Sequence, residues 1–261
     1  MEVLMALVKI QLTLLFLSFI ASPLKAQVED LKVNAIGYGY YNAFLLSANG
    51  KHLMIDSGVE GKEEKIIKKI KHLGVDPQDI SLLIITHVHG DHVGGAAFFQ
   101  KHYNIPVMVH TKETAIAESG RIAELKVGTQ KKKLAEWVKK RAHDEFPAFT
   151  PDILLEEDTL GLEQYGFPGK IFFVGGHSSG SIVLAIGEHI FAGDLLRGGL
   201  LCRKRPAYHF FAHNQKVLAN TLNGLMKQPY QTYYVGHGGP LKKQAIEKFL
   251  KKNPLPDVAN Q

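Results

Sequence analysis

The chain has 261 residues, 45% of them hydrophobic, and a formal net charge of +6. This composition excludes a disordered or collagen-like protein and provides enough apolar side chains for one large core. The positive charge is spread along the chain, which suits a small anionic substrate and argues against nucleic acid as a partner. The single cysteine, Cys202, excludes an internal disulfide, and we expect it to be buried as a small apolar residue.

The first 26 residues differ in character from the rest. Residues 10–20 are almost entirely apolar, Lys9 precedes them, and a short segment that ends at Ala26 follows. This pattern is typical of a cleaved signal peptide and predicts an exported protein, periplasmic or secreted, with no stable membrane span after cleavage. An uncleaved anchor is the alternative, but the apolar stretch is shorter than the roughly 20 residues that a span requires. We expect residues 27–261 to form one domain.

Short β-branched or apolar runs predict strands, and apolar residues at every third or fourth position predict helices. In the first half of the chain, strands are predicted at 31–36, 40–47, 51–55, 80–85 and 106–110, and helices at 61–73 and 96–103. Asn49-Gly50 indicates a two-residue hairpin turn. Asp76, followed by Pro77, indicates the start of a short helical turn.

The segment 111–150 interrupts this alternation of strands and helices. Thr129 is a candidate N-cap for a helix with Leu134, Trp137 and Val138 on one face. The many lysines of this segment form either a solvated helix face or a basic lid over a site. Beyond it, strands are predicted at 153–155, 171–174, 182–186, 189–192 and 230–235, and helices at 214–227 and 240–251. Two successive groups of strands and helices predict an α/β protein with two sheets packed face to face and helices outside.

The most chemically distinctive residues follow the apolar strand 80–85. His87, His89, Asp91 and His92 lie within six positions, and Gly90 between them permits a turn. Imidazole nitrogens and a carboxylate oxygen are ligands that a cation such as zinc accepts, and this group could serve two neighbouring metal positions. A run of solvated loop histidines is the alternative, which the buried strand before the group and the two glycines after it disfavour.

Similar patterns recur along the chain. In each, an apolar strand is followed by a histidine or carboxylate within two positions of a glycine: Asp56-Ser57-Gly58, Gly176-His177-Ser178-Ser179-Gly180-Ser181, Gly193-Asp194 and Gly236-His237-Gly238. Together with His-Xaa-His-Xaa-Asp-His at 87–92, these motifs and their order resemble the metallo-beta-lactamase superfamily over most of the chain after residue 26. The resemblance implies a four-layer αββα sandwich with two metal ions at one edge, between the sheets.

The resemblance also assigns roles to individual residues. The first metal ion would be held by His87, His89 and His177, and the second by Asp91, His92 and His237. Asp194 would bridge the two ions, and Asp56 would support the ligand loops. A histidine at 89, where the related flavodiiron proteins have glutamate, implies two Zn²⁺ ions per chain. A hydroxide bound to the metals would be the nucleophile, and Asp91 would have a catalytic role in orienting it.

The resemblance leaves the substrate open, because the superfamily cleaves several kinds of bond. The leading prediction is a small amide or ester, in particular a lactam or lactone, although Asp194 stands where some lactamase subclasses have a cysteine ligand. Basic residues that follow Asp194 either clamp a carboxylate of the substrate or form an ordinary surface loop: Arg197, Arg203, Lys204 and Arg205. Tyr208 is a further candidate for substrate contact.

Two other functions are compatible with the same ligands. A phosphodiesterase would use the basic residues to hold phosphate. A non-catalytic zinc-binding envelope protein would keep the ligands for folding alone, but structural zinc sites are usually closed by four protein ligands, and this set leaves open positions.

Overall fold

The computed structural model describes residues 31–122, 125–128, 132–140 and 142–254. The predicted signal peptide, its cleavage after Ala26 and the expected N-cap Thr129 lie outside the described residues.

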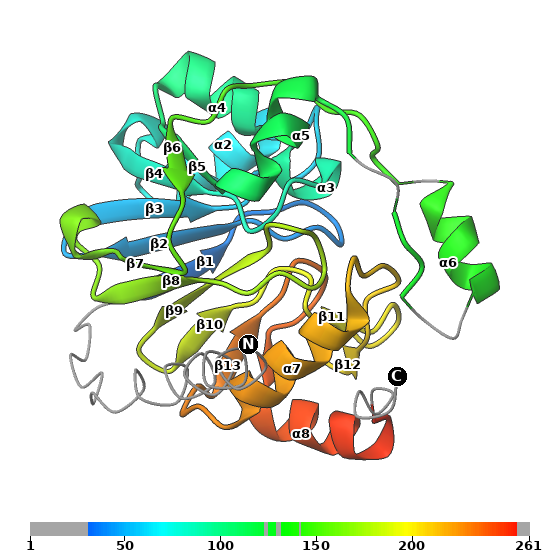
Figure 1. Cartoon of the computed structure of the whole chain (residues 1–261). Coiled ribbons are helices and arrows are strands. Elements are labelled where there is room, and N and C mark those ends of the chain that lie inside the picture. Colours follow the sequence, from blue (N-terminus) through cyan, green and yellow to red (C-terminus); the bar gives the residue numbers. More distant parts are fainter. Residues whose placement is uncertain (1–30, 123–124, 129–131, 141, 255–261) are drawn as a thin grey trace, which may run out of the picture.

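Two mixed sheets form the centre of the described part of the chain (Figure 1). The first sheet has the order β1-β2-β3-β4-β5-β6, with the strands Lys32–Ala35, Phe44–Ala48, Lys51–Ile55, Ile80–Ile84, Val107–His110 and Ile153–Leu155. The second has the order β14-β13-β10-β9-β8-β7, with β7 Thr159–Gly161, β8 Gly169–Phe173, β9 Ile182–Ile186, β10 His189–Phe191, β13 Thr232–Tyr234 and β14 Leu241–Lys242. A small pair joins β11 (Arg197–Gly198) to β12 (Pro206–Ala207).

Helices cover the outer faces of both sheets. Between the strands β3 and β6 of the first sheet, the chain forms α2 Glu63–His72, α3 Gly90–Val93, α4 Ala96–Tyr103, α5 Thr114–Ser119 and α6 Lys132–Lys139. The second sheet carries α7 Gln215–Met226 and α8 Lys243–Lys252. Short 3₁₀ turns lie at Pro77–Asp79, Thr111–Glu113 and Glu163–Tyr165.

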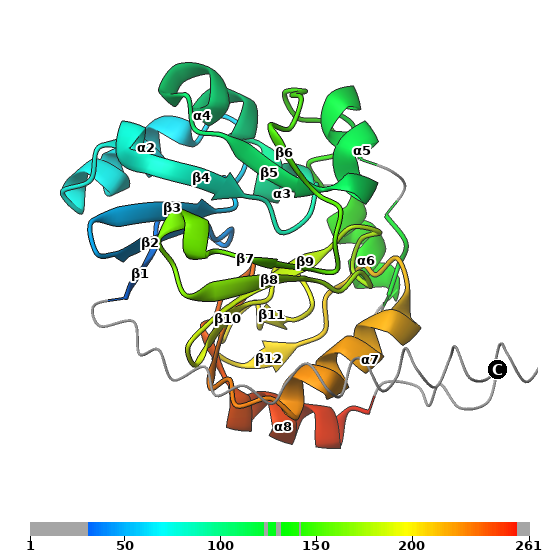
Figure 2. The same ribbon diagram turned by 60° about the vertical axis from the view of Figure 1, so that its left-hand side comes forward.

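The apolar residues of β4 explain why the sheets are covered on both faces. Successive side chains of a strand point to opposite faces, so Leu83 packs with the helices while Leu82 and Ile84 pack toward the second sheet. The helix layer over the first sheet includes Ile66 of α2. On the far face of the second sheet, Leu222 of α7 packs in the same way. Figure 2 shows the resulting helix, sheet, sheet and helix layers, which confirm the predicted αββα sandwich.

Local signals located several elements correctly. Asn49 and Gly50 both adopt positive φ angles between β2 and β3, as a tight hairpin turn requires. The side chain of Asp76 accepts a hydrogen bond from Gln78 N and caps the turn that follows. The helix predicted at 240–251 begins later, at Lys243, because Leu241 pairs with β13 in a short edge strand.

Within the segment 111–150, the helix α6 lies at one edge of the molecule, apart from the two sheets (Figure 1). Ala135 of α6 is fully buried and packs in a small cluster with Phe210 and Phe211. Leu134 and Val138 pack against the same cluster, as the predicted apolar face requires. Trp137, expected on that face, is 55% exposed.

Two observations concern the surface of the described residues. Cys202 is exposed, so the prediction of a buried cysteine is wrong; it lies in the loop between β11 and β12, outside every core cluster. Among the helices that the structure describes, none is both long and apolar enough to span a membrane.

Candidate metal centre

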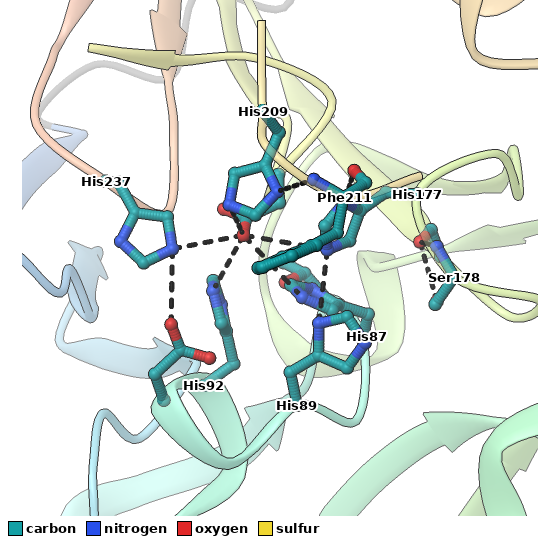
Figure 3. A network of polar contacts seen from close by, with 12 residues as sticks. His87, His89, His92, His177, Ser178, His209, Phe211 and His237 are labelled. Carbon is teal, nitrogen blue, oxygen red and sulfur yellow. Dashed lines mark hydrogen bonds and ion pairs between the residues drawn. The ribbon is translucent and has the colours of Figure 1, made fainter. Parts of the chain in front are cut away.

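The seven predicted metal ligands come together at one edge of the sandwich (Figure 3). The first sheet supplies four of them: His87 and His89 follow β4 directly, and Asp91 and His92 lie on the one-turn helix α3. The second sheet supplies the other three from the loops that follow β8, β10 and β13: His177, Asp194 and His237. Residues that are 150 positions apart in the sequence therefore meet because both sheets end at the same edge.

The first cluster consists of His87, His89 and His177. Their ring centroids lie 4.5 to 4.9 Å apart, with the rings nearly perpendicular to one another. The Nε2 atom of His177 is 3.1 Å from Nδ1 of His89. Three imidazoles with one nitrogen each directed at a common point are the arrangement of a three-histidine metal site.

The second cluster consists of Asp91, His92 and His237. His237 Nε2 lies 3.2 Å from Asp91 Oδ2, and one ligand atom from each of the three residues falls within 4.8 Å of the others. Tyr40 stacks on the His237 ring, and Tyr41 packs against its edge. These tyrosines belong to a segment predicted as a strand, but the regular strand begins only at Phe44.

Asp194 lies between the two clusters. Its Oδ2 atom is 3.1 Å from Nε2 of His237, 3.5 Å from that of His92, 3.6 Å from that of His177 and 3.9 Å from that of His87. One carboxylate oxygen thus faces histidines of both clusters, which is the placement that a ligand shared by two metal ions requires.

Metal ions fit this set of residues. Among the described residues, His87 Nε2, His92 Nε2, His237 Nδ1 and Asp194 Oδ1 are buried without a hydrogen-bond partner. A buried polar atom without a partner costs about 1–3 kcal/mol. The Nε2 atoms of His87 and His92 face Asp194 Oδ2, whereas His237 directs Nε2, and not Nδ1, toward that oxygen. Cations bound between the imidazole and carboxylate groups would satisfy ligand atoms of this kind, and zinc accepts this donor set.

Hydrogen bonds on the outer side of the cluster orient the ligand rings. His92 Nδ1 donates to Asp56 Oδ2 at 2.8 Å, and His177 Nδ1 donates to the backbone oxygen of Phe211 at 3.1 Å. A histidine that donates from Nδ1 keeps the Nε2 lone pair for a metal, so these contacts select the ligand form of both rings.

Asp56 links the two clusters by contacting Thr86, which precedes His87, and His92, as its predicted supporting role requires. Besides His92, its carboxylate accepts hydrogen bonds from the backbone nitrogen of Thr86 at 2.8 Å and from the Thr86 hydroxyl at 2.9 Å. Asp56 is buried and has a φ angle of +56°, a left-handed conformation that aspartate and asparagine tolerate better than most residues.

Glu113, which the sequence did not single out, joins the two loops of the first cluster. Its Oε2 accepts from the backbone nitrogen of Val88, between His87 and His89, at 2.9 Å. Its Oε1 accepts from the backbone nitrogen of Gly180 at 2.6 Å and from the Ser179 hydroxyl at 3.1 Å. The side chain is 1% exposed, so these contacts are shielded from water.

Burial and neighbouring charges set the protonation of the protein groups. Burial lowers the pKa of His89 to about 4 and that of His177 to about 3, which keeps both rings neutral and able to bind metal. For His237, burial alone would lower the pKa. The charge of Asp194 and hydrogen bonds to Asp194 and Asp91 outweigh this effect, so the pKa of His237 is raised to about 9. Burial acts to raise the pKa of Asp194, but His237, His209 and His92 hold it below its ordinary value. A bound metal would take the place of the proton on His237.

The predicted substrate residues do not line the cleft that opens onto the first cluster, which is described below. Arg197 is buried, donates to the backbone oxygen of Gly198 and lies over the Phe210 ring. Arg203 donates to the backbone oxygen of Gly39 at 2.8 Å, and Lys204 and Arg205 are exposed. The Tyr208 hydroxyl donates to the backbone oxygen of Asn253, and its ring packs on Phe249 of α8. Tyr208 is therefore directed away from the ligands.

A cleft of about 110 Å³ opens onto the first cluster instead. His89 and His177 lie in its wall together with Glu113, Ile116, Leu125, Lys126, Ser178, Ser179, Phe211, Ala212 and His213. Part of the segment 111–150 therefore borders the cleft, but the helix α6 with its lysines is not in the cleft wall. The cationic residue of this lining is Lys126, which sequence reasoning missed because nothing local marks it.

Comparisons with known proteins agree with this architecture. The model of the metallo-beta-lactamase superfamily matches residues 36–237. The probable metallo-hydrolase YqgX of Bacillus subtilis is 27% identical over 223 residues, which are 80% of this chain and 92% of that protein. The exodeoxyribonuclease WalJ of Streptococcus pneumoniae serotype 2 is 29% identical over 80 residues, 31% of this chain and 29% of that protein. Some relatives are thus matched over less than half of their length.

A solved structure shows the same fold at low sequence identity. The native FEZ-1 metallo-beta-lactamase of Legionella gormanii superposes with a TM-score of 0.57 and 17% identity, over 86% of this chain and 84% of that one. Because the family model spans most of the chain, and because the ligand motifs of that family converge at one edge of the same fold, this protein belongs to the metallo-beta-lactamase superfamily of hydrolases.

Proposed function

We propose that this protein is an exported hydrolase with two zinc ions that cleaves a small amide or ester, with a lactam or lactone as the leading substrate class. The observation that carries the proposal is the cleft that opens onto His89 and His177. A structural zinc site is closed by its protein ligands, whereas a catalytic site needs access for a substrate.

The donor atoms favour zinc. All seven ligand side chains are histidine or aspartate, and the exposed Cys202 is not among them. When bound, zinc would lower the pKa of a coordinated water to about 7 and polarise the attacked carbonyl. Asp91 is the carboxylate of the second cluster, with 21% of its side chain exposed, so it is placed to orient an attacking group.

The lining of the cleft suggests the kind of substrate. Ile116, Leu125, Phe211 and Ala212 provide apolar surface, and Lys126 provides a positive charge. A small molecule with an apolar body and an anionic group would match these features. In this proposal Lys126 replaces Arg203, Lys204 and Arg205 as the contact for the anion.

Export rests on the sequence of residues 1–26. If the signal peptide is cleaved as proposed, N-terminal sequencing of the protein recovered outside the cytoplasm will begin at Gln27. Recovery of the chain with its first residues intact would contradict cleavage.

A hydrolysis screen tests the activity. The purified protein with two equivalents of zinc would be offered a chromogenic β-lactam, a lactone, a thioester and a bis-aryl phosphodiester. We expect turnover of the lactam or the lactone, loss of that turnover in His89→Ala, and retention in His72→Ala, which removes an exposed histidine of α2. No turnover of any compound by protein with two zinc ions would contradict the proposal and favour a zinc-binding role.

A phosphodiesterase is the second candidate, because several relatives are exodeoxyribonucleases. Those relatives also mean that the sequence-based expectation of no nucleic-acid partner is unsupported. Turnover of the bis-aryl phosphodiester alone, followed by cleavage of a DNA oligonucleotide, would select this candidate.

A further inference from the structure

His209 is a buried histidine at the metal centre that none of the sequence motifs includes. Its side chain is 8% exposed, and its Nε2 atom lies 3.0 Å from Oδ2 of Asp194. The ring stacks on His237 with 5.4 Å between centroids and meets the edge of the His177 ring at 4.6 Å. Figure 3 shows it above the shared carboxylate, on the side opposite His92.

The other ring nitrogen of His209 determines where its hydrogen lies. Nδ1 accepts a hydrogen bond from the backbone nitrogen of Phe211 at 3.3 Å. A nitrogen that accepts a hydrogen bond carries no hydrogen, and one nitrogen of a neutral imidazole carries the single hydrogen. The hydrogen of His209 therefore lies on Nε2, which faces Asp194.

His177 has the opposite arrangement and uses the same residue, Phe211. The backbone oxygen of Phe211 can only accept, so it faces a hydrogen on Nδ1 of His177 and leaves Nε2 with a free lone pair. A metal ligand needs that lone pair. The two peptide groups of Phe211 thus select a metal-binding form for His177 and a donor form for His209.

We propose that His209 is a positioning residue of the metal centre, which donates a hydrogen bond from Nε2 to Asp194 Oδ2 and does not bind metal itself. The inference rests on the proposed two-metal site. The hydrogen bond fixes the rotation of the Asp194 carboxylate, so that Oδ2 stays directed at the histidines of both clusters. Oδ1 has no hydrogen-bond partner among the described residues. His209 is missed by sequence reasoning because it lies 15 positions after Asp194 in an irregular segment.

Side-chain replacements of graded length test this role. The amide nitrogen of glutamine reaches about as far as Nε2 of histidine, whereas that of asparagine is one carbon shorter. His209→Gln, His209→Asn, His209→Ala and His177→Ala would be compared with the wild type by competition titration of Zn²⁺ against a chromophoric chelator. The visible absorption of the Co²⁺-loaded proteins would report the number and type of metal ligands.

We expect wild type and His209→Gln to bind two ions with similar affinity. His209→Asn and His209→Ala should also bind two ions, about 10- to 100-fold more weakly, with an unchanged Co²⁺ spectrum, since loss of an outer hydrogen bond typically has this effect. His177→Ala, which removes a ligand, should lose one ion. If the alanine variant fails to fold, the comparison of glutamine with asparagine supplies the same test.

Two results would overturn the proposal on its own. An altered Co²⁺ spectrum or a lost ion in His209→Asn would show that His209 is a metal ligand. Unchanged Zn²⁺ affinity in both His209→Asn and His209→Ala would show that His209 has no positioning role. A wild-type protein that binds no metal would overturn the proposed function, and this inference with it.

Discussion

The carboxylate of Asp56 receives three hydrogen bonds that tie the strand end of β4 to a ligand of the second cluster. The negative carboxylate accepts the hydrogen on Nδ1 of His92. The backbone of Asp56 is in the left-handed region, with a φ angle of +56°. An asparagine at this position would keep the backbone conformation and one acceptor oxygen, while its amide group would face a donor.

Asp56→Asn should therefore weaken zinc binding at the second cluster by about 10- to 100-fold with little change in the fold. Chelator competition measures the affinity, and circular dichroism checks the fold. Asp76→Asn, which changes an exposed capping residue, is the matched control. Unchanged affinity in Asp56→Asn would show that the carboxylate does not orient His92.

Gly236 precedes the ligand His237 and has no room for a side chain. A Cβ atom there would overlap Oδ1 of Asp194 and the ring of His92. Gly224 of α7 has nothing within 4 Å of the same added atom. The two glycines thus offer a matched pair of substitutions with opposite expected effects.

Gly236→Ala should displace both ligands and lose at least one metal ion along with activity. Gly224→Ala should keep both ions and stabilise the protein by about 0.5–1 kcal/mol, because alanine is the better helix former. Metal analysis and thermal unfolding of the two variants check this. Full metal content in Gly236→Ala would contradict the observed packing.

The sequence predicted those residues that lie beside glycine shortly after a strand, such as His177, Asp194 and His237. It did not predict His209 or Glu113, whose roles depend on atoms that are far away in the chain. Glu113 acts on Val88 and Gly180, and no local pattern marks either contact.

At the scale of elements, strand and helix positions followed from periodicity, and their ends followed from pairing. Lys51–Ile55 and Ile182–Ile186 match the predicted strands because both contain at least three successive apolar residues and have clear turns beside them. The strand expected from Tyr40 begins at Phe44, because Tyr40 and Tyr41 pack on His237 instead. The strands β7, β11 and β12 were missed, since runs of two or three residues carry little periodicity.

The 3₁₀ turn Thr111–Glu113, between β5 and α5, connects the loops that carry His87 and His177 through the side chain of Glu113. Glu113→Ala would leave the buried backbone nitrogens of Val88 and Gly180 without partners, which costs about 1–3 kcal/mol for each. We expect a clear loss in the free energy of unfolding and weaker metal binding at the first cluster, measured by urea unfolding and chelator competition. Glu118→Ala, at an exposed position of α5, is the control, and equal stability of the two variants would contradict the role of Glu113.

At the scale of the whole molecule, the metal centre joins the two sheets. The first sheet supplies His87, His89, Asp91 and His92, and the second supplies His177, Asp194 and His237. Bound ions would therefore connect the two halves of the sandwich as well as serve the reaction. The ligand side chains are brought together only in the folded state, so metal binding must stabilise that state.

Removal of metal should lower the melting temperature. Binding with free zinc at 100 times the dissociation constant contributes about 2.7 kcal/mol per site, and about 1 kcal/mol shifts the melting temperature of a protein of this size by roughly 2–4 °C. Calorimetry with and without a chelator should thus show a loss of several degrees, reversed by added zinc. An unchanged melting temperature would argue against metal ions that connect the sheets.

Two metal ions between the sheets are the feature on which the proposed function depends. Elemental analysis of the purified protein, with its concentration measured in the same sample, would count them. We expect two zinc ions per chain after dialysis and one in His177→Ala. Wild-type protein with one ion or none after incubation with excess zinc would exclude a centre of two metal ions.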